Sequence, residues 1–142
     1  MFRLGLPAPK SGSGHMEIAG IGTQVIDCLR VRKLIDRHED AFLAQVYTSR
    51  EQVFCRDRRH ATEHYAALWA AKEAVFRSLG TTWKKGTAWT DVEILCENPV
   101  DPAVVVTGPT RALLDARGVK NVLVTMAHCR TFATATAMAV RG

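Results

Sequence analysis

The chain has 142 residues, a length typical of a single domain whose core is large enough to fold without metals or disulfides. Its formal charge of +5 and its pI near 9.3 favour an anionic partner, which could be a nucleotide, a nucleic acid or an acidic protein. The four cysteines form no C-x-x-C pair, so neither a zinc knuckle nor a disulfide scaffold is indicated, and we expect reduced thiols in a cytoplasmic protein. No apolar run approaches membrane-spanning length, and the start of the chain has no continuous signal-peptide core.

Residues 1–16 are rich in Pro, Gly and Ser, and we expect a flexible N-terminal tail there, followed by one domain over residues 17–142. An apolar stretch that contains Gly20 and Gly22 predicts a buried strand over about 17–26, in which the glycines allow close backbone approach. Asp27 can cap the helix that follows. One face of that helix is apolar and the other is basic, the two sets being Leu29, Val31, Leu34 and Ile35, and Arg30, Arg32, Lys33 and Arg37.

A short helix is predicted over about 40–46, and Thr48 with Glu51 has the spacing of a capping box that begins another helix. Residues 52–60 are rich in charge and could be helix or loop. The longest helical pattern follows and ends at Gly80, which supplies the left-handed residue common at helix ends. Residues that recur at offsets of three and four predict an amphipathic helix whose wide apolar stripe faces the core, and this side of the helix carries Tyr65, Leu68, Trp69, Lys72, Val75, Phe76 and Leu79.

The last part of the chain is predicted to be mainly strand. Strand patterns cover residues 89–95, 104–106, 121–126 and 132–140. A turn joins the first two, a hairpin joins the last two, and between these pairs Pro109 begins a short helix that Gly118 ends. About five strands and three or four helices in this order predict an α+β domain whose helices pack on one face of a largely antiparallel sheet.

The residues alone leave the chemistry open. Glu73 and Arg77 are neighbours on a helix surface, and such pairs are more often solvated ion pairs than sites. Lys72 could equally be a side chain at the edge of the apolar stripe, and His128 a turn or core histidine. There is no P-loop, G-x-G-x-x-G, H-E-x-x-H or nucleophile elbow. A basic α+β domain could bind RNA, but the aromatic RNP motifs are missing, so we expect no nucleic-acid partner.

Five sequence blocks stand in a fixed order along residues 17–140. They are G-I-G-T at 20–23, W-A-A-K-E-A at 69–74, L-G-T at 79–81, G-T-A-W-T-D-V-E-I at 86–94 and V-T-M-A-H at 124–128. In order and approximate spacing they resemble the holo-acyl-carrier-protein synthases, and W-A-A-K-E-A is the signature of that 4′-phosphopantetheinyl transferase family. The agreement of five blocks in one order is far more specific than that of any single block.

The resemblance implies a 4′-phosphopantetheinyl transferase-like α+β fold and assembly as a homotrimer. Members of the family bind coenzyme A and Mg²⁺ at the seams between subunits. Their reaction moves the 4′-phosphopantetheine arm of coenzyme A onto a serine of an acyl carrier protein, leaves adenosine 3′,5′-bisphosphate and serves fatty acid biosynthesis. The chemistry suits a basic protein, because displacement at the β-phosphorus of a pyrophosphate needs a metal and cations placed around the charged oxygens.

Carried over residue by residue, the resemblance assigns catalysis to Glu73 and Arg77. Glu73 would hold the metal together with the residue at position 24, which is Gln24. The residues expected to contact coenzyme A are Lys72, Arg77, Gly80 and His128. The basic helix face would meet the acidic carrier protein through Arg30, Arg32, Lys33 and Arg37.

Three positions depart from the family pattern. Gln24 replaces the aspartate that shares Mg²⁺ with the glutamate, so the site keeps an oxygen ligand but loses a charge. Arg77 replaces a lysine, which keeps phosphate binding but removes any role in proton transfer. Leu68 replaces a common arginine. Two hypotheses follow: an atypical active phosphopantetheinyl transferase, or an impaired paralogue that binds coenzyme A or carrier protein without efficient transfer.

Overall fold

The computed structural model describes residues 16–81, 87–98 and 100–142, and all but the last residue of the predicted tail lies outside these ranges. The helices are α1 (Cys28–His38), α2 (Asp40–Val46), α3 (Ser49–Arg56), α4 (Ala61–Ser78), the 3-10 helix η1 (Trp89–Asp91) and α5 (Gly108–Ala116). The strands are β1 (Glu17–Asp27), β2 (Val92–Leu95), β3 (Ala103–Val106), β4 (Val119–His128) and β5 (Phe132–Arg141). The predicted α+β class is therefore confirmed, with five α-helices in the described residues where three or four were expected.

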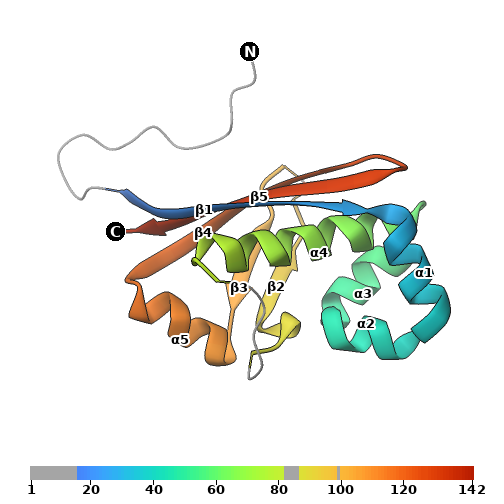
Figure 1. Ribbon diagram of the computed structural model, residues 1–142, viewed down its shortest axis with the longest axis horizontal. Helices are drawn as coiled ribbons and strands as arrows, with labels where there is room; N and C mark the ends of the chain where they lie inside the picture. Colours follow the sequence, from blue (N-terminus) through green and yellow to red (C-terminus); the bar gives the residue numbers. More distant parts are fainter. Residues whose placement is uncertain (1–15, 82–86, 99) are drawn as a thin grey trace, which may run out of the picture.

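All strand pairs in the described residues are antiparallel, but they form two sheets instead of one. The larger sheet has the order β1-β5-β4, and the smaller sheet pairs β2 with β3. The predicted hairpin between residues 121–126 and 132–140 is confirmed as β4 and β5. Figure 1 shows the larger sheet running along one side of α4.

Helix α4 lies at the centre of the molecule, in contact with the larger sheet and also with β2, α1 and α3 (Figure 1). Because neighbours cover it on several sides, nearly all of its length from Tyr65 to Ser78 is buried. The prediction of a single apolar stripe was therefore too narrow. Alanines fill the additional buried positions: Ala66, Ala67, Ala70, Ala71 and Ala74. Their small side chains let strands and helices approach the α4 backbone closely.

Local capping signals begin and end the helices as predicted. Asp27 Oδ1 accepts a hydrogen bond from the backbone N–H of Leu29 at 2.8 Å and caps α1. Thr48 and Glu51 form the predicted capping box of α3. Because α3 extends to Arg56, the first part of the 52–60 stretch, which could have been helix or loop, is helical. At the end of α4, Gly80 has φ of 74°, the left-handed conformation expected there.

The predicted strand over residues 89–95 begins later than expected, at Val92. The chain first makes the 3-10 turn Trp89–Asp91, which the side chain of Asp91 stabilises. Its Oδ2 accepts hydrogen bonds from the Ala88 N–H at 3.3 Å and from Thr110 Oγ1 at 2.9 Å. These bonds to a side-chain carboxylate compete with strand pairing, so the alternating pattern is overridden locally.

Strand β1 lies directly against α4 because of two glycines. A Cβ atom at Gly22 would meet Ser78 N at 2.6 Å and Arg77 Cβ at 2.7 Å, and one at Gly20 would collide with the Ser78 carbonyl. Only glycine permits this approach, as the sequence pattern predicted. The inward-facing position that follows Gly22 on β1 is Gln24, so the close contact brings that side chain to the surface of α4.

Candidate functional site

The two residues assigned to the metal by the resemblance lie in direct contact. Gln24 Nε2 donates a hydrogen bond to Glu73 Oε2, and both side chains are half-buried between β1 and α4. The amide oxygen of Gln24 accepts the N–H of Val25 at 3.0 Å. Within the described residues Glu73 makes no ion pair with Arg77, so the ordinary helix ion pair considered above does not form.

Two further predicted residues lie close by at the C-terminal end of α4. Arg77 is exposed in the last turn of the helix, with its Cβ against β1 at Gly22. Gly80 is exposed just beyond it. The chain thus places Gln24, Glu73, Arg77 and Gly80 along β1 and the C-terminal half of α4, with the exposed Arg77 one helical turn beyond the Glu73 carboxylate. Such an arrangement can hold a phosphate-bearing ligand at its cationic end.

Lys72 is in a different environment from the other predicted ligand contacts, because its side chain is fully buried. Its Nζ lies 2.7 Å from Glu51 Oε1, and it donates to the carbonyls of Val92 at 2.7 Å and Trp89 at 3.2 Å. These contacts use all three N–H donors of an ammonium group. Burial lowers the pKa of Lys72, and the neighbouring Glu51 carboxylate opposes that shift. The phosphate contact assigned to Lys72 would require it to leave these partners.

Glu51 completes this buried pair, and the sequence pattern did not reveal it as a partner of Lys72. The carboxylate also accepts the N–H of Thr48 and the N–H of Ile94, each at 2.8 Å. The pair therefore ties α4 to α3 and β2. The only available signal was the capping box of Thr48 and Glu51, which predicted a local role for the carboxylate but not the ion pair.

His128 lies at the opposite end of α4 from Arg77 and Gly80. Its Nδ1 is 3.0 Å from Glu63 Oε1 in the first turn of α4, and its ring packs against that of His64 with centroids 4.6 Å apart. The hydrogen bond from His128 holds the pKa of Glu63 below its ordinary value, while burial lowers the pKa of His64. The ten residues from Glu63 to Glu73 span about 15 Å of helix, so one chain does not bring His128 to Glu73.

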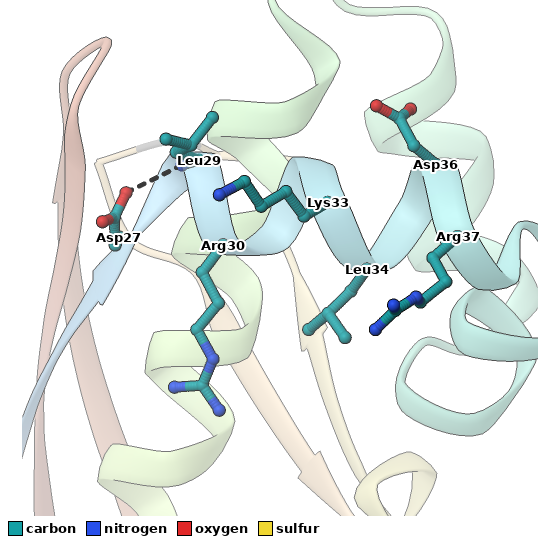
Figure 2. Close-up of a pocket in the computed structure, with 7 residues that line it drawn as sticks. All are labelled: Asp27, Leu29, Arg30, Lys33, Leu34, Asp36 and Arg37. Carbon is teal, nitrogen blue, oxygen red and sulfur yellow. Dashed lines mark hydrogen bonds between the residues drawn. The ribbon is translucent and has the colours of Figure 1, made fainter.

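The basic residues of α1 border an open groove of about 650 Å³ (Figure 2). Its lining is Asp27, Leu29, Arg30, Lys33, Leu34, Asp36 and Arg37. Arg32 lies outside the lining, with its Nε 3.9 Å from Asp36 Oδ2. The Arg30 guanidinium lies over the Trp69 ring at 5.7 Å from its centroid, which connects the groove to α4.

One apolar position of α1 was predicted wrongly. Leu29 is 57% exposed, whereas Cys28 and Val31 are buried. The inward positions follow the spacing of Cys28, Val31 and Ile35, three and four residues apart, because the helix begins immediately after Asp27. Leu29 therefore lies in the wall of the groove instead of the core.

Three further properties of the described residues bear on function. The described ranges contain no group of three or more His, Cys, Asp or Glu side chains arranged to hold a metal ion. No helix found there combines the length and the apolar character needed to cross a bilayer. The four cysteines, which all lie within these ranges, form no disulfides.

A family model described as the 4′-phosphopantetheinyl transferase superfamily matches residues 20–136. The chain belongs to this superfamily. Within it, the holo-[acyl-carrier-protein] synthase of Rhodopirellula baltica is 33% identical over 120 residues, which cover 84% of this chain and 95% of that protein. The protein of the same name from Desulforudis audaxviator is 40% identical over 123 residues, with 87% and 93% coverage.

Solved structures of the same family have the same fold. The holo-[acyl-carrier-protein] synthase of Neisseria meningitidis superposes with a TM-score of 0.78 at 22% identity and covers 87% of this chain and 98% of that one. The enzyme of Helicobacter pylori in complex with coenzyme A has a TM-score of 0.73 at 22% identity, with 84% and 98% coverage. At these identities the superpositions bear on the fold, which confirms the predicted transferase-like α+β architecture.

The buried ion pair leads to a stability prediction. Lys72→Met should destabilise the fold by about 3 to 5 kcal/mol, because it leaves the Glu51 carboxylate buried without its counter-charge. Arg32→Met is the matched control, since it removes a cation from an exposed pair and should cost less than about 1 kcal/mol. Urea unfolding at one fixed protein concentration measures both. Equal midpoints for the two variants would contradict the role assigned to the buried pair.

Proposed function

We propose that this chain is a holo-acyl-carrier-protein synthase, which transfers 4′-phosphopantetheine from coenzyme A to a serine of an acyl carrier protein and releases adenosine 3′,5′-bisphosphate. The observation that carries the proposal is the contact between Glu73 of the W-A-A-K-E-A block and Gln24, the residue after the G-I-G-T block. Two distant blocks of the family signature meet there on the family fold. The names of the curated relatives support the same activity.

Glu73 and Gln24 are the proposed protein ligands of Mg²⁺. This ion is commonly held by one or two carboxylates together with substrate phosphates, so a single carboxylate and an amide oxygen fit a metal that coenzyme A helps to hold. In this structure the amide nitrogen of Gln24 faces Glu73, and the amide must turn to present its oxygen. When bound, Mg²⁺ would supply Lewis-acid stabilisation of the phosphate charge.

The other residues of the site act on the phosphates and on the approach of substrates. Arg77, exposed beside Glu73, would bind phosphate oxygens, and the exposed backbone at Gly80 leaves room for the ligand. The lack of a lysine at position 77 removes a proton donor, so in this proposal Arg77 only binds and orients. In this proposal Lys72 stabilises the fold and does not contact coenzyme A, because the three N–H donors of its ammonium group are occupied inside the protein.

The groove on α1 is the proposed docking surface for the carrier protein. Arg30, Lys33 and Arg37 line it, and carrier proteins are strongly acidic. Complementary charge raises association rates and selects partners more than it raises affinity. Exposed Leu29 and half-buried Leu34 give the same groove an apolar component that a helix of the partner could cover.

A homotrimer is the proposed assembly, and the uncovered face of the larger sheet supports it. On the side of this sheet that faces away from α4, three rows of cross-strand neighbours from β1, β5 and β4 contain no charged side chain among the described residues. The rows are Ile21, Met138 and Leu123; Thr23, Thr136 and Thr125; and Val25, Thr134 and Ala127. Ile21 and Val25 are 56% and 61% exposed. Contiguous uncharged surface of this kind marks an interface. A neighbouring copy could then bring its His128 toward Glu73 and complete the site.

Transfer activity is the direct test of the proposed function. Incubation of an apo carrier protein with coenzyme A, Mg²⁺ and this protein should add the mass of phosphopantetheine, which mass spectrometry detects. Glu73→Gln should abolish the gain, because it removes the only carboxylate proposed for the metal. A parent protein that binds coenzyme A and leaves the carrier protein unmodified would instead be the impaired paralogue. Undiminished transfer by Glu73→Gln would contradict the metal assignment.

Gln24→Asp should strengthen Mg²⁺ binding and raise transfer more than Arg77→Lys does. A second carboxylate in a half-buried site adds attraction to a divalent ion, on the order of 1 to 3 kcal/mol after desolvation, or tens of fold in affinity. Arg77→Lys exchanges one cation for another and so mainly alters geometry. Metal titration calorimetry with and without coenzyme A, beside transfer rates, compares both variants with the parent. Unchanged metal affinity in Gln24→Asp would disprove the proposed ligand position.

Light scattering should give a mass three times the 15.7 kDa of one chain. Val25→Lys should dissociate the assembly, because a lysine on the uncharged sheet face would be buried against a neighbouring copy. Val53→Lys is the matched control, since Val53 is 49% exposed on α3, away from that face. A monomeric parent at micromolar concentration would rule out the trimer, and a trimeric Val25→Lys would place the interface elsewhere.

A further inference from the structure

The first turn of α4 holds His128 through one polar contact and one ring contact. Glu63 Oε1 lies 3.0 Å from His128 Nδ1, and the His64 ring packs at a steep angle of 64° against the imidazole. The side chain of Glu63 is only 15% exposed and that of His128 31% exposed. Two independent contacts from adjacent helix residues therefore restrict both the position and the rotation of the ring.

We propose that Glu63 is a positioning residue for His128, which fixes the imidazole with Nδ1 on the carboxylate and Nε2 available to coenzyme A. This inference rests on the proposed function, because it takes His128 to contact that substrate. The reason is chemical: an ionised carboxylate only accepts hydrogen bonds, so Nδ1 must carry the hydrogen when the contact forms. The remaining ring nitrogen, Nε2, is then the atom that faces a ligand, and the tautomer of the imidazole is fixed before the ligand binds.

Several neighbouring groups could compete for the Glu63 carboxylate. His60 Nδ1 lies 3.9 Å from Glu63 Oε2, and Arg58 and His64 lie near enough to affect charge in the cluster. The shorter contact goes to His128, and the hydrogen bond from His128 is the largest cause of the lowered pKa of Glu63. Arg58 is directed elsewhere, with its guanidinium over the Phe54 ring at 4.3 Å from the centroid. His128 is thus the principal partner of Glu63.

Nitrogen-15 NMR of the imidazole rings tests the positioning without any substrate. The two ring-nitrogen shifts distinguish the neutral tautomers of a histidine, so spectra are recorded over a pH series and the tautomer is read at alkaline pH, where the shifts no longer change with pH. His128→Gln assigns the signal by removing it. In the parent we expect a protonated Nδ1, and in Glu63→Gln a shift toward the Nε2-protonated form, because the amide can donate to Nδ1. Glu17→Gln is the matched control, since it removes a carboxylate from the exposed pair with Arg141 on the sheet.

Coenzyme A binding supplies the second measurement, made in a double-mutant cycle. Glu63→Gln should weaken coenzyme A binding several-fold in the parent and change nothing further in the His128→Gln background. Equal weakening in both backgrounds, or an unchanged His128 tautomer in Glu63→Gln, would overturn the positioning role. If His128→Gln bound coenzyme A as tightly as the parent, the proposed contact between His128 and coenzyme A would be disproved. The NMR result alone would then decide whether Glu63 orients the ring.

Discussion

The buried ion pair of Lys72 and Glu51 is the constraint on which the rest of the structure depends. An ammonium group removed from water must find partners for its charge and for all of its donors, and here α3, β2 and η1 supply them. The pair therefore fixes how far α4 is rotated about its axis. Because successive helix residues are about 100° apart, fixing Lys72 toward α3 and β2 directs the next residue, Glu73, toward a different neighbour. That neighbour is β1.

The glycines of β1 complete the geometry from the other side of the helix. Gly20 and Gly22 let the strand backbone touch α4 near Ser78, so the strand packs at a separation that a side chain at either position would prevent. Gln24 follows on the same face and meets Glu73. The proposed metal site thus lies where a helix of fixed rotation meets a strand of fixed approach. Neither residue is on a loop, which gives the site the rigidity that positioned catalytic groups require.

Features that depend on neighbouring residues could be predicted from the sequence. The caps at Asp27 and Thr48, the left-handed Gly80 and the close approach at Gly22 all follow from local chemistry, and all occur. The features that were missed depend on contacts between distant segments. Periodicity could not reveal that α4 is covered on several sides, that the strands divide into two sheets, or that Asp91 would delay β2 by bonding to Thr110.

The same distinction between local features and contacts of distant segments applies to the candidate site. Family resemblance predicted the contact between Gln24 and Glu73, which periodicity alone could not, since it joins residues 49 positions apart. The partners of Lys72 and His128 were missed because a carboxylate in a capping box or in a first helical turn already has a sufficient local explanation. Only the fold shows that Glu51 and Glu63 each face a second, distant group.

The separation of functional groups along α4 has a consequence for how the proposed reaction could work. Reacting groups must lie within a few ångströms of their substrate, yet Glu63 and its partner His128 are about 15 Å along the helix from Glu73. A long substrate could extend between them, but the rigidity of α4 means that one chain cannot close the distance. The proposed homotrimer offers the alternative, because a neighbouring copy packed on the uncharged outer face of the larger sheet would bring groups of a second chain to the site. In that proposed arrangement His128 would act in the site of a neighbouring copy. Its orientation by Glu63 would then matter more, because the ring would have to be held in place before the second chain and the substrate bind.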